Sequence, residues 1–148
     1  MNYLNQLTKT LDENYKKLPQ LPKGVNEFIV SVAPWLALIF GVLAIVTGLG
    51  AFGLLTALSP FAMVSGAGRY AMSGLLASLI LLVQGVIEVW AFPSLKKRAM
   101  KGWNLMFYSL VLSVVASLIT LSVGSVIGAV VGALIGYYFL YQVKSYYK

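Results

Sequence analysis

Neither cysteine nor histidine occurs among the 148 residues of this sequence. Their absence excludes disulfides, thiolate chemistry, zinc sites built from these residues, and the usual acid–base side chain at neutral pH. Acidic residues are also few, four in all, and Asp12 is the single aspartate. A serine–histidine site and an aspartate pair are therefore excluded as well. We expect a protein that is not an enzyme and that holds no cofactor and no metal.

Charged residues of both signs make up only 10% of the sequence, against about 25% in a typical soluble domain. Hydrophobic residues make up 59%. A soluble protein of this size would expose large apolar patches with such a composition. The sequence therefore predicts an integral membrane protein.

Four apolar segments follow one another, and each has about the 20 residues that a helix needs to cross a hydrocarbon core. The fold class predicted is all-α, a four-helix up-down bundle that spans the membrane and is preceded by an amphipathic helix. The spans are expected at about residues 32–58, 70–92, 103–121 and 126–143, with a very short turn near residues 122–125.

Residues 1–18 alternate apolar and charged positions with the period of an amphipathic helix. One interpretation is a helix lying on the membrane surface or against the bundle, and the other is a helix that binds a cytoplasmic partner. Residues 19–31 are expected as a linker that begins with Pro19 and Pro22, although the part before Pro34 is also compatible with an extension of the first span. The apolar stripe consists of Leu4, Leu7, Leu11, Tyr15 and Leu18.

The basic residues predict the orientation. With four spans, ten of the eleven bases fall on one side, and Arg69 alone falls on the other. The positive-inside rule then places both termini in the cytoplasm, in a cell membrane crossed several times. Tryptophans map to the same interface, at Trp35, Trp90 and Trp103. The densest basic segment is expected to contact anionic lipid head groups, rather than nucleic acid, through Lys96, Lys97, Arg98 and Lys101.

Glycine recurs at every fourth position of the last span, at Gly124, Gly128, Gly132 and Gly136. Such a face has almost no side-chain volume, so that another helix backbone can approach it closely. Packing inside one chain and a glycine zipper between the chains of a homo-oligomer are both consistent with this pattern.

Glu88 is the single acidic residue inside an apolar span, and Gln84 lies one turn before it on the same helix face. Ionisable residues within the membrane are costly and often mark function. Glu88 is near the basic segment, so it serves either as a structural anchor that pairs with a base or as a site for an ion or proton.

Residues 91–108, which read AFPSLKKRAMKGWNLMFY, and residues 135–144, which read IGYYFLYQVK, resemble a group of small bacterial membrane proteins of unassigned role. Some members carry a transporter label, including chromate transport. An anion carrier is expected to place bases within its spans, and this sequence has none there, so the chromate label is not carried over.

The leading hypothesis is a non-enzymatic membrane subunit that self-associates and has a role in the permeation of a small ion or solute. The alternative is a scaffold or assembly factor that recruits a cytoplasmic protein through the helix at residues 1–18.

Overall fold

The computed structural model describes the backbone of residues 2–120 and 123–148, and the side chains of these stretches except at positions 2–5, 7, 8, 120, 123 and 125. The described chain is helical and contains no strand, which confirms the all-α class. The side chains of Leu4 and Leu7, the last residue of the span expected at 103–121 and the first residue of the expected turn at 122–125 lie outside what is described. The elements are α1 (Asn2–Tyr15), α2 (Lys23–Val64), α3 (Gly68–Lys96), α4 (Met100–Thr120), α5 (Val123–Gln142) and a short 3-10 turn, η1 (Lys144–Tyr146).

The helix α2 is much longer than the span expected at residues 32–58. It begins at Lys23, so residues 23–31, expected in the linker, form its first turns, and it continues through both Pro34 and Pro60. Its 42 residues correspond to a length of about 63 Å, roughly twice the thickness of a hydrocarbon core. The connector between α1 and α2 is correspondingly short.

Pro60 does not end α2, and a hydrogen bond explains why. A proline lacks the N–H that would donate to the carbonyl four residues earlier, which here belongs to Thr56. The hydroxyl of Ser59 donates to that same carbonyl oxygen at 2.8 Å. Because the side chain replaces the missing backbone donor, the helix runs on to Val64.

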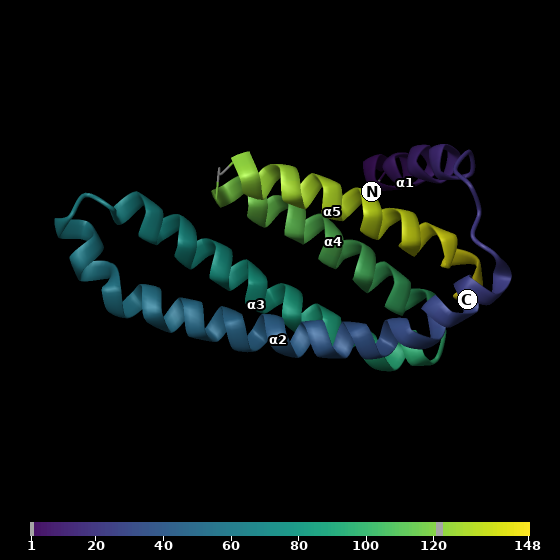
Figure 1. Cartoon of the computed structure of the whole chain (residues 1–148), viewed down its shortest axis with the longest axis horizontal. Helices are drawn as coiled ribbons and strands as arrows, with labels where there is room; N and C mark the ends of the chain where they lie inside the picture. The colour runs from purple at the N-terminus through teal and green to yellow at the C-terminus, as the bar shows by residue number, and fades with distance from the viewer. Residues whose placement is uncertain (1, 121–122) are drawn as a thin grey trace.

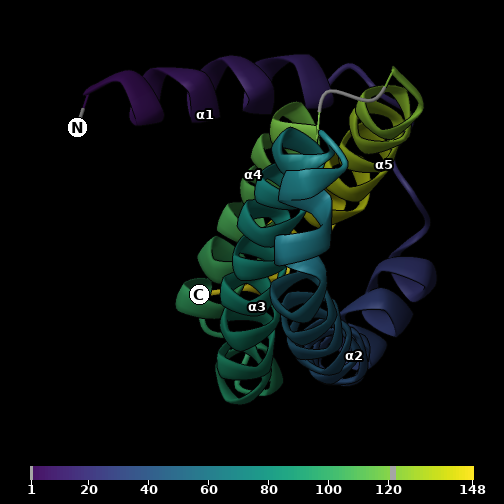
Figure 2. The ribbon, with the colours of Figure 1, turned by 90° about the vertical axis from the view of Figure 1, so that its left-hand side faces the viewer.

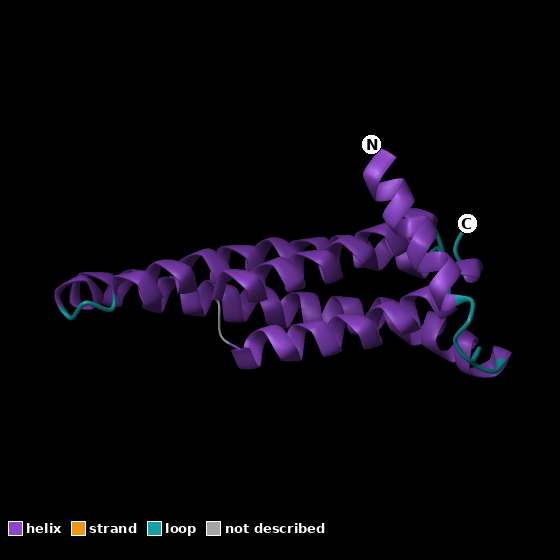
Figure 3. Cartoon of the chain, turned by 90° about the horizontal axis from the view of Figure 1, so that it is seen from above, coloured by secondary structure: helices purple, strands orange, loops and turns teal. Residues whose placement is uncertain are grey.

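Consecutive helices from α2 to α5 run antiparallel, and each packs on the next (Figure 1). The hairpin of α2 and α3 reaches well beyond α4 and α5 at the end opposite the termini (Figures 1 and 3). By length and composition, α2, α3 and the Met100–Ile119 part of α4 are suited to cross a membrane. The Val126–Gln142 part of α5 is apolar but shorter.

A close helix contact joins α2 to α3 at a pair of glycines. A Cβ built on Gly85 would lie 2.7 Å from the carbonyl oxygen of Gly41, and a Cβ built on Gly41 would lie 2.9 Å from the carbonyl oxygen of Gly85. Two turns further along α2, Gly48 is equally close to Leu82 of α3, at 2.8 Å. The two backbones therefore touch with no side chain between them.

Most of the buried apolar side chains gather at the end of the molecule that holds both termini. Elsewhere the helices expose large apolar side chains. The most exposed is Val64 at the far tip, with 91% of its surface accessible. The buried cluster draws on α2, α3, α4 and the segment after α5, and it consists of Val30, Ala37, Ala91, Leu95, Trp103, Phe107, Val143 and Tyr147.

The helix α1 projects sideways from the bundle (Figures 2 and 3). Its last turns dock on the end of α5. The ring of Tyr15 stacks on that of Tyr141, with 4.9 Å between centroids. The carboxylate of Asp12 forms an ion pair with the ammonium of Lys144, with 2.7 Å between Oδ2 and Nζ. Burial against α5 raises the pKa of the Tyr15 phenol.

The glycine contact predicts that Gly85→Ala destabilises the protein. The added methyl would meet the backbone of Gly41 and Ile45, which cannot move aside cheaply. Overpacking of this kind costs about 1–3 kcal/mol, so we expect a lower melting temperature in detergent. Gly53→Ala is the matched control, because no atom of the described residues lies within 4 Å of a Cβ at that position. Equal melting temperatures for the two variants would contradict the contact.

Candidate functional site

Glu88 lies between α3 and α4 and is only 8% exposed. Its Oε1 atom accepts a hydrogen bond from the hydroxyl of Ser109 on α4 at 2.7 Å. The amide of Gln84, one turn earlier on α3, donates to the same oxygen at 3.2 Å. The three side chains form a polar cluster within otherwise apolar helices, and the structure thus brings Gln84 and Glu88 together as expected.

The donors that reach Glu88 are neutral. Among the residues that the structure describes, the one ion pair is that of Lys144 with Asp12, so the expected pairing of Glu88 with a nearby base does not occur there. The basic side chains around the α3–α4 turn are exposed. A carboxylate held by neutral donors leaves room for a proton or a monovalent cation to balance its charge, whereas divalent ions usually need more carboxylate ligands.

Ser109 was not singled out by the sequence as a partner of Glu88, although it belongs to a stripe of serines on its helix. The spacing of the two residues in the sequence did indicate this contact. Glu88 lies ten residues before Arg98, and Ser109 lies ten residues after Ala99. In an antiparallel hairpin, residues equally far from the turn stand at the same level. Further along the stripe, Ser113 instead donates to the carbonyl of Leu110 in its own helix.

The turn between α3 and α4 is a Schellman motif with an unusual residue. The N–H of Ala99 donates to the carbonyl of Ser94, and the N–H of Arg98 donates to that of Leu95, both at 2.9 Å. Arg98 has a φ of 52°, in the left-handed region where glycine is the rule. A side chain there costs about 1–2 kcal/mol. The turn therefore keeps a base at a position that conformation alone would give to glycine.

Glycine is used in this turn at Gly102 instead. A Cβ on Gly102 would lie 2.6 Å from the backbone nitrogen of Leu95. The segment after η1 secures the turn further, because the N–H of Met100 donates to the carbonyl of Lys148 at 2.8 Å and the N–H of Lys148 donates to that of Arg98 at 2.9 Å. Burial raises the pKa of the neighbouring Tyr147 phenol, while the guanidinium of Arg98 lowers it in part.

Bases and aromatic rings pair around the same end. The ammonium of Lys96 lies 5.7 Å from the ring centroid of Trp35, and that of Lys101 lies 5.5 Å from Trp90. These distances are typical of cation–π contacts. The residues expected at lipid head groups are all exposed in this turn, namely Lys96, Lys97, Arg98 and Lys101.

Trp103 differs from the other two tryptophans. It was expected at the membrane interface, but it is only 2% exposed. Its indole N–H donates to the carbonyl of Leu140 on α5 at 2.7 Å, and the ammonium of Lys144 lies 4.9 Å from its ring. Trp103 therefore joins α4 to α5 inside the protein. Trp35 and Trp90 remain more than half exposed.

The four glycines of α5 do not form one packed face. Gly136 faces α4, where a Cβ would lie 2.8 Å from Leu110. Nothing described lies within 4 Å of a Cβ on Gly124, Gly128 or Gly132. A four-residue step turns about 40° past a full helical turn, so the stripe rotates away from α4 along the helix.

No family model, no curated protein and no solved structure matches this chain. The resemblance of residues 91–108 and 135–144 to small bacterial membrane proteins stays a prediction. What the chain does must be argued from its own geometry.

Proposed function

We propose that this protein is a non-enzymatic membrane subunit with four spans that takes part in the permeation or transport of a small cation. The observation that carries the proposal is the buried carboxylate of Glu88, which, within the described residues, receives hydrogen bonds from neutral donors only. A charge in such surroundings is costly unless a proton or cation balances it, and intramembrane carboxylates of this kind mark ion and proton paths.

The membrane setting is supported by the distribution of apolar surface. Side chains such as Leu49 and Leu134, both 59% exposed, cover the middle of α2 and α5. Lipid tolerates this exposure and water does not. Bases cluster at the end with both termini, and Arg69 lies at the opposite end, in the first turn of α3. We accordingly place the termini in the cytoplasm and α2 to α5 across the cell membrane.

Self-association is supported by the open glycine face of α5. Gly128 and Gly132 are exposed, and the neighbouring Ile127 and Val131 are about half exposed or more. Small residues on an exposed face let a second helix approach to backbone contact. We propose that this face meets the same face of another copy, so that the protein works as a homo-oligomer.

A second candidate, a scaffold that recruits a cytoplasmic protein, is favoured by the position of α1. The helix projects from the bundle and is held near its last turns, through Asp12 and Tyr15 (Figure 2). Its polar residues Lys9, Thr10 and Glu13 are exposed. If ion flux does not depend on Glu88, this candidate replaces the first.

The orientation can be tested with single cysteines, because the chain has none of its own. Ser65→Cys, at the exposed end of α2, should react with a membrane-impermeant maleimide on intact cells. Ser145→Cys, exposed in η1, should react only after the cells are permeabilised. Labelling of Ser145→Cys on intact cells would reverse the proposed orientation.

The role of Glu88 can be tested by Glu88→Gln in proteoliposomes loaded with a monovalent-cation or proton indicator. Glutamine keeps the shape of the side chain and a hydrogen-bonding oxygen, but it removes the charge. Loss of a charge-assisted contact should lower the flux about tenfold. Glu27→Gln, which changes an exposed carboxylate near the start of α2, should leave it unchanged. Wild-type flux through Glu88→Gln would remove the support for transport.

The oligomer can be tested with the double variant Gly128→Leu and Gly132→Leu. The bulky side chains should block the glycine face, and the mass of the purified protein in detergent should fall to that of one chain. Gly50→Leu and Gly53→Leu together form the matched control, because they lie on open surface of α2. A mass that both double variants share with the wild type would mean that lipid, and not a second copy, covers the face.

A further inference from the structure

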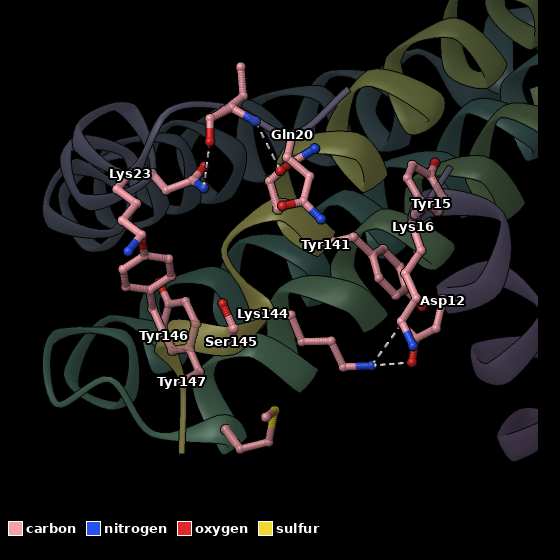
Figure 4. A pocket seen from close by; sticks show the side chains of 14 residues that line it. Asp12, Tyr15, Lys16, Gln20, Lys23, Tyr141, Lys144, Ser145, Tyr146 and Tyr147 are labelled. Carbon is pink, nitrogen blue, oxygen red and sulfur yellow. Dashed lines mark hydrogen bonds and ion pairs between the residues drawn. The ribbon is translucent and has the colours of Figure 1, made fainter. Parts of the chain in front are cut away.

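A cavity of about 630 Å³ opens at the end of the molecule that holds both termini. Its walls come from the end of α1, the connector, the start of α2, the end of α5 and η1, so that segments far apart in the sequence share it (Figure 4). Its volume is within the range of small-molecule sites, roughly 300–1,000 Å³. It is separate from the cluster around Glu88, none of whose residues lines it.

The cavity is built by specific contacts. The carbonyl of Pro19 accepts hydrogen bonds from the hydroxyl of Tyr138 at 2.7 Å and from the amide of Gln142 at 3.1 Å. Gln142 in turn accepts one from the N–H of Leu21 at 3.3 Å. These bonds fix the connector to α5 across more than 100 residues of sequence, and the ion pair of Asp12 with Lys144 fixes α1.

Positive charge predominates in the lining. Lys16, Lys23 and Lys144 line the cavity, and Asp12 is its one acidic residue. Asp12 is paired with Lys144, whereas Lys16 and Lys23 have no carboxylate within ion-pair distance among the described residues. In Figure 4, Lys23 lies on the side of Tyr146 and Tyr147, and Lys16 lies opposite with Tyr15. Lys23 and Lys16 therefore belong to opposite walls of the cavity, and Lys23 shares α2 with another lining residue, Asn26.

Two buried polar atoms at the cavity have no partner in the described structure, namely Oδ1 of Asn26 and the hydroxyl of Tyr141. Asn26 is only 8% exposed, and its Nδ2 donates to the carbonyl of Leu21 at 3.4 Å. Buried polar atoms are nearly always hydrogen-bonded, and an exception calls for an unseen partner. An amide oxygen needs a donor such as a hydroxyl, and a phenol accepts or donates.

We propose that this cavity binds a phosphate ester of a small polyol, with the phosphate at Lys23 and a ligand hydroxyl on Asn26, which lies about one turn further along α2. Phosphate suits lysine as a point charge, and the polyol supplies the donor that Asn26 lacks. Glycerol phosphate is the simplest ligand of this chemistry. It occurs free in solution or as the head group of an anionic lipid. The lipid source rests on the membrane placement proposed above, and the free source does not.

The test uses the full-length protein and two probes. Calorimetric titration with glycerol phosphate in detergent micelles measures the free ligand. Native mass spectrometry from nanodiscs that contain equal phosphatidylglycerol and phosphatidylcholine measures retention of the lipid. We expect Lys23→Gln to weaken binding of either probe about tenfold. The matched control is Lys9→Gln, an exposed α1 lysine outside the cavity lining, and it should have no effect.

Asn26→Leu tests the hydroxyl contact separately. The wild type should bind glycerol phosphate more tightly than inorganic phosphate, and the variant should bind both alike. Retention of phosphatidylglycerol with no binding of free glycerol phosphate would assign the ligand to the lipid. The proposal is overturned if neither probe binds, or if Lys23→Gln binds as Lys9→Gln does. Because no ion flux enters these measurements, their failure is independent of the result for Glu88.

Discussion

The backbone contact between Gly41 and Gly85 is the constraint on which the rest of the bundle depends. In lipid, apolar side chains gain little by leaving the solvent, so helices associate through close dispersion contacts and hydrogen bonds. Only glycine at both positions allows the two backbones to touch. The same contact holds α2 against the face of α3 next to Glu88, where Ala91 is fully buried.

The sequence was sufficient where one local property decides the outcome. Composition predicted the helical class, and apolar segment length located the helices. The sequence was insufficient where a contact between side chain and backbone, or between two helices, determines the structure. The first span was expected to end at about residue 58, just before Pro60, but the helix continues because the hydroxyl of Ser59 donates to the carbonyl of Thr56. The four-residue spacing of glycines in α5 was visible in the sequence. The sequence did not show which side of α5 faces α4. In the structure, Gly136 packs against α4 and Gly128 does not.

The candidate site divides in the same way. Gln84 and Glu88 are four residues apart on one helix, so their contact follows from helical geometry alone. Ser109 reaches Glu88 only because the α3–α4 turn has one particular length. Arg98 in a left-handed conformation and Gly102 against Leu95 make that turn tight, and they set the level of α4 relative to α3. The sequence placed a base at position 98 where glycine is usual, so this turn carried no strong signal of its own.

The location of the buried core is itself an argument about the solvent around this protein. Burial of apolar side chains is favourable only where the alternative is water. The core lies at the end with the bases and both termini, and it includes Leu95, Trp103 and Tyr147. Toward the far end, α2 and α3 pack a leucine of one helix on a glycine of the other, as with Leu55 on Gly74, and they expose other large side chains, such as Phe61 at 73%. A protein surrounded by water throughout would have its core near the middle. A core confined to one end is what a chain would form if only that end met water, and there the cavity beside Asn26 would be open to ligands from the aqueous phase and from the lipid surface alike.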